Sequence, residues 1–398
     1  MTEMIQARAE PPRDCADVVA ACALASVPGM GGAALARVAQ AFGSLGAALQ
    51  AGPGAIAAKA AALRLRREAT DFLGQHPDLE KLGAWAFSAA RAAGARVLTP
   101  DSASYPALLR QIQNPPAVLY VRGELTEHPR RVALVGARAA DEAALQLARE
   151  LGEELAAAGV QIVSGGARGV DAAAHAGALW GGGSTVAVMG SGIDVAYPPE
   201  NGALFERIAA GGGALVSEFP PGTPSTRPNF PRRNRTIAGL SHATVVVRAS
   251  AASGALITAR HAASQHRPIF AVPGDPADEL SAGPDQLLSS GVAAPVRCAG
   301  DVLGLLGWAV PEQLGALRAT RQAAVRPPAP VHAQEALEGP ALRVWELLDG
   351  ARPVHVDVLA SQAQLRPDEA LRSLTELEMK GLIHQRPGKY FLRSRGWS

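Results

Sequence analysis

The sequence predicts an α/β protein built on an extended Rossmann-like, doubly wound, mostly parallel sheet, with an N-terminal helical domain and a C-terminal winged-helix domain. From Arg131 onward, short apolar runs alternate with amphipathic helical segments: RVALVG, VQIVSG, STVAVMG, ALVSEF, ATVVVRA and PIFAVPG. Runs that are almost continuously apolar are typical of parallel strands covered by helices on both faces. At 398 residues and 48% hydrophobic content, the chain is long enough for two or three domains.

The region before the sheet reads as helical, and we expect a domain over residues 1–95. Residues 17–43 form two apolar helical segments joined by Pro28-Gly29-Met30-Gly31, the pattern of a helix-hairpin-helix or SAM-like domain. Glycines at such a helix start allow backbone N–H groups to approach a phosphate. An ordinary αα-hairpin fits the same residues equally well. The stretch through YPALL, NPPAV and VLYVRG is expected to be an extended connector.

The sheet domain is expected over residues 96–309, followed by a Pro- and Ala-rich linker at 310–339 and a winged helix at 340–398. In that last domain three helical segments, ALRVWELL, VDVLASQAQ and PDEALRSLTELEMKG, precede the strand-turn-strand LIHQRPGKYFLR. The third segment would be the recognition helix, yet it carries a net charge of −2. Because a helix that enters a major groove is normally basic, we expect a protein-interaction or regulatory module.

Glycine-rich loops follow the predicted strands, at VGAR (135–138), SGGARGVD (164–171), MGSGID (189–194) and SGALIT (253–258). Ligands of doubly wound sheets bind at the carboxyl ends of the strands, where glycines expose N–H groups at helix starts. Tight βα turns also need glycine for their geometry. The candidate ligand-binding residues of these loops are Gly136, Ser164, Gly165, Gly166, Gly169, Gly190, Ser253, Gly254 and Thr258.

Positive charge is concentrated in one part of the chain. Between Phe219 and Gly274 there are seven arginines and no Asp, Glu or Lys, although the whole chain carries only +2. FPRRNRTIAGLS (230–241) should place its basic end beside the glycine loops, and arginine binds phosphate through a planar, permanently charged fork. We expect a groove for a polyanion, lined by Arg138, Arg168, Arg232, Arg233, Asn234 and Arg235. Phe230 and Tyr197 either stack on bases or pack the fold.

Other chemistries find little support. The sequence has no G-x-x-x-x-G-K-[ST], and Gly190-Ser191-Gly192 lacks the third glycine of a dinucleotide fingerprint, so no nucleotide cofactor is expected. Asp171 and His175 are four residues apart on one helix and could form a catalytic pair, but Asp171 is better explained by the helix start. Glu218 stands alone and is read as structural.

The three cysteines form no C-x-x-C pair, so neither a disulfide framework nor a zinc site is expected. No run of apolar residues is long enough for a membrane span, and no signal pattern opens the chain. We therefore expect a cytoplasmic protein without a membrane partner.

With these motifs in view, the chain resembles the DNA-processing protein A family (DprA, also called Smf). The matching segments occur in order across residues 131–275: VALVGAR, IVSGGARGVDAAAH, TVAVMGSGIDVAYPPEN, LVSEFPPGT, FPRRNRTIAGLS, SGALITARHA and IFAVPG. The upstream YPALLRQIQNPPAVLYVRGEL is also similar. The resemblance implies a non-catalytic, usually dimeric protein that binds single-stranded DNA during natural transformation, shields it from nucleases and helps to load the RecA recombinase. Its DNA pocket would correspond to Arg138, Arg168 and the Arg232-Arg233-Asn234-Arg235 group.

The sequence departs from the family pattern at several positions. Ala137 replaces a serine, Gly166 a bulky residue, and Arg248 an acidic one, while Gly283-Pro284-Asp285 replaces a Gly-x-Asn element. We expect Arg248 to make the crevice more basic.

Two other functions remain open at this point. One is a nucleotide phosphoribohydrolase similar to the lysine-decarboxylase-like proteins, although SGALITARHAASQ lacks the glutamate of their P-G-G-x-G-T-x-x-E run. The other is a protein-interaction scaffold.

Overall fold

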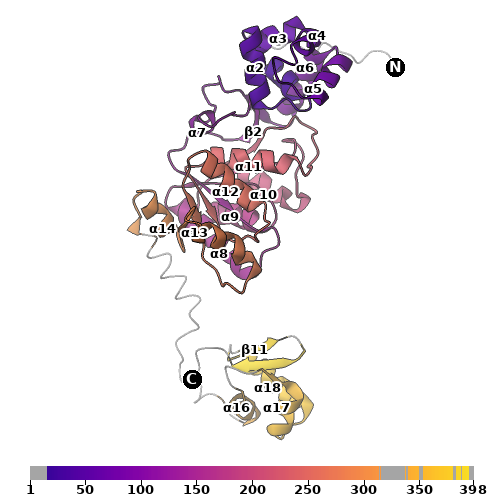
Figure 1. Ribbon diagram of the computed structural model, residues 1–398. Helices are drawn as coiled ribbons and strands as arrows, with labels where there is room; N and C mark the ends of the chain where they lie inside the picture. Colours follow the sequence, from indigo (N-terminus) through magenta and orange to yellow (C-terminus); the bar gives the residue numbers. More distant parts are fainter. Residues whose placement is uncertain are drawn as a thin grey trace, which may run out of the picture. The chain divides into compact units, whose positions relative to one another are not determined.

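The computed structural model describes residues 16–312, 314, 337, 339–348, 353–379, 382–386 and 388–393. The chain divides into two compact units, residues 1–314 and 315–398 (Figure 1). Most of the expected linker lies outside the described residues, and the boundaries at 95/96 and 339/340 stay predictions. No helix among these residues combines the length and the apolar character that a bilayer span requires.

In the first unit, nine of the described strands form one sheet in the order β1-β2-β6-β5-β4-β3-β7-β8-β9. The strands are β1 (Ala95–Leu98), β2 (Leu119–Gly123), β3 (Arg131–Val135), β4 (Gln161–Ser164), β5 (Thr185–Met189), β6 (Ala214–Ser217), β7 (Ala243–Val246), β8 (Ile269–Ala271) and β9 (Ala294–Pro295). All six predicted apolar runs are therefore strands, and they pair in parallel. The fold class is confirmed.

The expected extended connector contributes two strands to the sheet. β2 pairs antiparallel with both β1 and β6. β1 lies at the sheet edge and has a mixed burial pattern. β2 is buried over Leu119–Val121, as a strand inside the sheet is. These two strands are what extends the Rossmann-like sheet.

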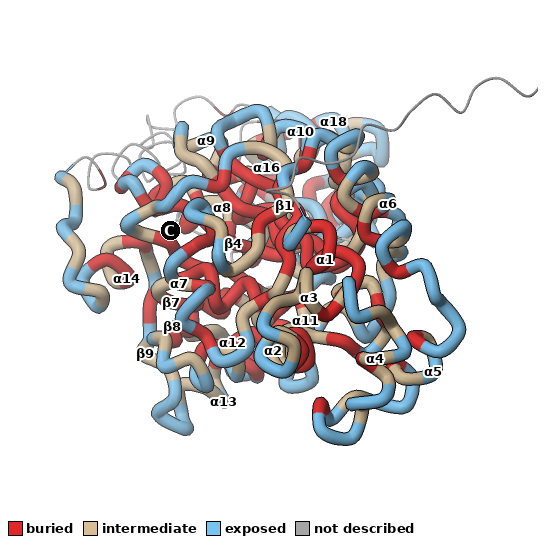
Figure 2. Tube along the Cα trace, turned by 90° about the horizontal axis from the view of Figure 1, so that it is seen from above, coloured by how far each residue is buried: buried red, intermediate tan, exposed pale blue. Residues whose placement is uncertain are grey.

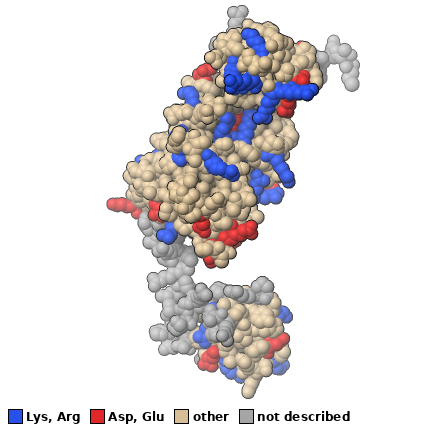
Figure 3. Space-filling view, in the orientation of Figure 1, with Lys and Arg blue, Asp and Glu red and all other residues tan. Residues whose placement is uncertain are grey.

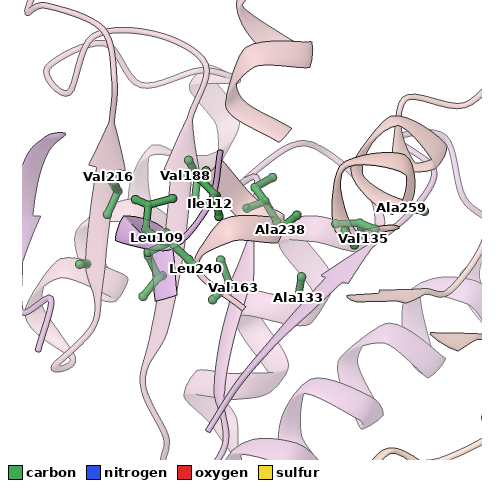
Figure 4. Close-up of a cluster of buried hydrophobic side chains, with 14 of the residues drawn as sticks. Leu109, Ile112, Ala133, Val135, Val163, Val188, Val216, Ala238, Leu240 and Ala259 are labelled. Atoms are coloured by element: carbon green, nitrogen blue, oxygen red, sulfur yellow. The ribbon is translucent and has the colours of Figure 1, made fainter. Parts of the chain in front are cut away.

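Helices cover both faces of the sheet. Those that follow the N-terminal region are α7 (Ala107–Arg110), α8 (Glu142–Ala157), α9 (Val170–Trp180), α10 (Gly202–Ala210), α11 (Asn229–Gly239), α12 (Ala255–Ser264), α13 (Ala282–Ser289) and α14 (Ala299–Leu305). Along β5, Val186 and Val188 pack in a core with α7, α11 and α12, whereas Ala187 and Met189 pack in another core with α10. Figure 4 shows part of the first core, and Figure 2 shows the buried strands beneath exposed helix surfaces. Two buried faces explain why these strands are apolar at successive positions.

The N-terminal helices are α1 (Ala16–Ala25), α2 (Gly32–Phe42), α3 (Leu45–Ala51), α4 (Pro53–Ala58), α5 (Arg67–Gln75) and α6 (Leu79–Ala92). The predicted hairpin is α1, a turn with Gly29 at φ +76°, and α2. Cys22 of α1 and Ala86 of α6 are buried in one cluster with Tyr120 of β2 and Phe205 of α10. The N-terminal helices therefore share a core with the sheet.

The second unit has the predicted winged-helix order. It contains α16 (Gly339–Glu346), β10 (Val354–His355), α17 (Val356–Gln362), α18 (Pro367–Met379), β11 (Ile383–Arg386) and β12 (Tyr390–Arg393). β12 pairs antiparallel with both β10 and β11. The apolar sides of its helices meet over Val344, Leu359, Leu377 and Phe391, which form a core of their own.

Candidate nucleic-acid interface

A crevice opens where the sheet reverses its winding direction. The chain runs outward from β3 through β4, β5 and β6, then crosses back to β7 on the other side of β3. In doubly wound sheets this switch point is the usual ligand site. Here it holds a pocket of about 360 Å³, lined by residues that follow β3, β4 and β7 and by the start of α11. A smaller pocket of about 190 Å³ adjoins it and shares Arg138, Phe230 and Arg233. We call these two pockets together the crevice.

The basic end of α11 is positioned by its first turn. Pro231 lies in that turn, where its missing N–H would have no helical partner. The Asn229 amide donates to the backbone oxygen of Gly190 over 3.1 Å, which ties the helix start to the loop after β5. At the other end, a side chain at Gly239 would collide with Leu109 and Ile112, so the helix packs closely on the core there. The charges of 232–235 are thereby placed at the carboxyl edge of the sheet.

Arg233 is buried rather than open to solvent, with 4% of its surface exposed. Its Nη1 donates to the backbone oxygen of Val188 over 3.1 Å. Burial lowers the pKa of Arg233 to about 10 and raises the pKa of the facing Asp171. The attraction between the two charges acts against both shifts. Because a side chain at Gly165 would collide with both groups, that glycine admits the buried pair. Arg233 thus forms the floor of the crevice.

Glu218 is not alone, as the sequence suggested, but is the centre of a charged cluster. Its Oε2 lies 3.2 Å from both Nε of Arg232 and Nη2 of Arg235, and Thr236 donates to its Oε1. The Glu218 side chain is only 1% exposed, whereas those of Arg232 and Arg235 are 37% and 21% exposed. One carboxylate therefore offsets part of the charge of two predicted DNA-binding arginines.

The exposed charges of the crevice are Arg138 and Arg168. Cζ of Arg138 lies 4.5 Å from the centre of the Phe230 ring, and no carboxylate among the described residues forms an ion pair with it. Arg168 is also exposed and pairs with Glu200 on the surface. The Tyr197 ring, 44% exposed, lies 6.1 Å from Phe230. Phe230 therefore packs against charge and ring neighbours, while Tyr197 is partly exposed to solvent.

Most of the predicted glycines and hydroxyls are explained by packing and hydrogen bonds within the loops. Side chains at Gly136, Gly166 and Gly190 would collide with or crowd Val170, Phe205 and Phe230. Gly169 has φ +75° and abuts the backbone of Ala137 and Arg138. Ser164 donates to the backbone oxygen of Leu134 over 2.6 Å. These contacts account for the residue types without a ligand.

The loop before α12 is more open. No atom lies within 4 Å of the position where Gly254 would carry a side chain. The Asn234 amide donates to the Gly254 oxygen over 3.1 Å, and the Ser253 hydroxyl accepts from the Ala255 N–H. Ser253, Gly254, Asn234 and Thr258 all line the crevice. Their role toward a ligand stays a prediction.

The expectation of one groove lined by five arginines is wrong. Arg138, Arg168 and Arg233 line the crevice, whereas Arg232 and Arg235 line a separate cavity of about 550 Å³. The reason is helical geometry: residues three apart share one face of α11, and Arg233 points to another. The second cavity also takes in Arg37, Arg64 and Arg66, which no motif in the sequence links to α11.

The expected effect of Arg248 is also wrong. Its Nε lies 3.7 Å from Oδ2 of Asp278, and its Nη1 donates to Ser281. It lines neither pocket of the crevice. Arg248 therefore forms a structural ion pair with Asp278 and does not add charge to the crevice.

Asp171 and His175 do not contact each other as a catalytic pair would, in line with the preference for a structural role of Asp171. His175 is fully buried, its Nδ1 lies 2.7 Å from the Thr185 hydroxyl, and burial lowers its pKa to about 3. Asp171 instead faces Arg233 and accepts from the Ala167 N–H. Among the described residues, no group of three His, Cys, Asp or Glu side chains could hold a metal ion.

Fold and crevice together define a doubly wound α/β protein with an arginine-lined crevice at the switch point. Residues 96–307 match the sequence model of DNA recombination-mediator protein A, and residues 327–389 match that of the DprA winged helix domain. The chain belongs to the DprA/Smf family of DNA-processing proteins.

Individual relatives support this family assignment. Protein Smf of Synechocystis sp. is 36% identical over 326 residues, which cover 74% of this chain and 79% of that protein. DNA processing protein DprA of Streptococcus pneumoniae is 41% identical over 202 residues, covering 50% of this chain and 70% of that protein. The X-ray structure of DNA processing protein A from S. pneumoniae superposes with a TM-score of 0.61 at 30% identity, covering 73% of this chain and 97% of that one.

Proposed function

We propose that this protein binds single-stranded DNA in the crevice, with phosphates held by Arg138 and Arg168 and by the open loop at Gly254. The observation that carries the proposal is the exposed Arg138 charge at the switch point, without a carboxylate partner among the described residues. Its guanidinium keeps donors free for a phosphate. The exposed Tyr197, which lines the same pocket as Arg138, favours a strand whose bases are unstacked.

In the cell, the proposed role is to protect incoming DNA and to assist loading of the RecA recombinase during natural transformation. We propose that the protein acts as a cytoplasmic homodimer and catalyses no reaction. Membership of the DprA/Smf family supports this role. The separate engagement of Asp171 and His175 supports the absence of catalysis.

Fluorescence anisotropy with a labelled single strand and its duplex, at two salt concentrations, tests the proposal. Wild type should prefer the single strand, and its log K should fall with log salt by about 0.7 for each phosphate contacted. Arg138→Gln/Arg168→Gln should lose most of the affinity, whereas Arg91→Gln/Arg207→Gln, two exposed arginines that line neither cavity, should not. Failure of wild type to bind the single strand refutes the proposal. Base release from nucleoside monophosphates, abolished by Glu218→Gln, would favour the hydrolase instead.

A further inference from the structure

The cavity of about 550 Å³ between the N-terminal helices and α11, here called the cleft, has basic residues on both walls. Arg37, Arg64 and Arg66 line the N-terminal wall, and Arg232, Arg235 and His261 line the wall formed by the sheet domain. None of the described residues that line it is a carboxylate. Figure 3 shows Lys and Arg side chains gathered over the N-terminal helices and around the hollow below them.

The two walls are held in fixed positions. α1 and α6 share a buried core with β2 and α10, so the N-terminal helices cannot swing away without exposing apolar surface. The start of α2 also abuts the connector, because a side chain at Gly32 would collide with the backbone of Pro115. From the opposite wall, Nη1 of Arg235 donates to the Asn114 oxygen over 2.6 Å. The cleft is therefore a built feature of the fold.

The charge of the N-terminal wall is available to a ligand. No described carboxylate forms an ion pair with Arg37, Arg64 or Arg66, and the last two are exposed. Arg37 donates through Nε to the Leu63 oxygen over 2.7 Å, which fixes that side chain. Glu68 lies near Gly29 at the rim but does not line the cavity. On the other wall, the buried Glu218 offsets only part of the charge of Arg232 and Arg235.

The cleft adjoins the crevice. Pro231 lines both cavities, and the His261 ring, on the cleft side, lies 3.2 Å from the Pro231 oxygen. A chain of phosphates that leaves the crevice past Pro231 therefore enters a second basic channel at once. Five arginines on two walls suit several successive phosphates, whereas a single anion would engage only one or two of them.

We infer that the cleft is a second phosphate-binding site, which holds the backbone of the same nucleic-acid strand as it leaves the crevice. The inference rests on the proposed function, because the strand must first occupy the crevice. It gives the N-terminal helical domain a direct role in DNA binding. It also predicts that the protein binds long strands more tightly than short ones, since only a strand that extends beyond the crevice reaches Arg64 and Arg66.

The test uses the full chain, the Arg64→Gln/Arg66→Gln variant and single strands of about 5 and about 20 nucleotides, one near the lower end of typical single-strand site sizes and one beyond the upper end. The variant should bind the long strand about 10-fold more weakly at about 0.1 M salt, with a salt slope smaller by about 1.4 for two lost phosphates. Its affinity for the short strand should equal that of wild type. The Arg91→Gln/Arg207→Gln control should match wild type at both lengths.

Other outcomes separate the two claims. If Arg64→Gln/Arg66→Gln binds the long strand as wild type does, while Arg138→Gln/Arg168→Gln loses it, the cleft is not part of the path and the proposed function stands. Equal losses on the short and the long strand also overturn the inference, because the cleft would then not act as a continuation of the crevice. If wild type binds neither strand, the proposed function itself fails.

Discussion

The guanidinium of Arg138 lies over the ring of Phe230, with Cζ 4.5 Å from the ring centre. Cζ of Arg233 lies 5.7 Å from the centre of the same ring, so Phe230 contacts both an exposed and a buried cation. Among the described residues that line the crevice, Arg138 is the only charged one that is both exposed and without an ion-pair partner, and the ring contact fixes its position. Phe230 therefore positions Arg138, whatever else it contacts.

Phe230→Leu should weaken single-strand binding by about two- to fivefold, because an exposed cation–π contact contributes about 0.5–1 kcal/mol. The measurement is anisotropy at fixed salt, with Phe230→Tyr as the control that keeps the ring. In the Arg138→Gln background, Phe230→Leu should add nothing further. An additional loss there would show that the ring contacts the DNA directly.

Arg233→Gln should destabilise the protein strongly, by about 3–5 kcal/mol, because it leaves the Asp171 carboxylate buried without its cation. Arg232→Gln, which changes a more exposed partner of Glu218, should cost about 1 kcal/mol or less. Urea denaturation of both variants gives the two free energies. Equal effects would contradict the assignment of Arg233 to the floor of the crevice.

Glu218→Gln should lower stability and raise single-strand affinity together. The Glu218 side chain is buried and accepts from Arg232, Arg235 and Thr236, so its loss leaves polar groups without their charged partner at a cost of about 3 kcal/mol. The two freed arginines should also steepen the salt dependence of long-strand binding. Denaturation and anisotropy on the same preparation measure both effects. Reduced affinity in a folded variant would contradict the assignment of Glu218 as a charge-offsetting group.

Acid should destabilise the protein partly through His175. Burial lowers the pKa of His175 from 6.5 to about 3, so below pH 6.5 the unfolded chain binds a proton that the folded one does not. The stability contributed by the neutral ring is present above pH 6.5 and is lost as the pH falls toward 3, by at most about 1.4 kcal/mol per pH unit. Compared with wild type, His175→Asn should show a shallower loss of unfolding free energy over that range. Parallel curves would show that His175 does not titrate on unfolding.

Removal of residues 315–398 should leave single-strand affinity within about twofold of wild type, because α18 has more acidic than basic residues and would repel phosphates. Asp368 and Glu369 lie at its start and both lie within 3.5 Å of Arg366. Anisotropy with single-stranded and duplex oligonucleotides measures the change. A loss of duplex binding on truncation would instead make the winged helix a duplex reader.

The sequence by itself determined the six parallel strands from β3 to β8 and the kind of side chains that gather after them. Central parallel strands are apolar at successive positions because both of their faces are buried, and this pattern is visible along the chain. The edge strand β1 was not predicted, because a half-covered edge imposes no such pattern. β2 is buried over Leu119–Val121 and lies inside the sheet, but its apolar run was interpreted as part of an extended connector. The basic stretch at 230–241 likewise predicted an anion site, since its composition is a property of one segment.

Only the tertiary structure decided what each of those charges does. Within one turn of α11, Arg233 is buried beside Asp171 while Arg232 and Arg235 share Glu218 and face the cleft. How deeply each arginine is buried, which carboxylate offsets its charge and which cavity it lines depend on groups far away in the chain, such as Glu218, Asp171 and Arg64. Local sequence fixes the kind of side chain, but its electrostatic environment is set by the segments that fold against it.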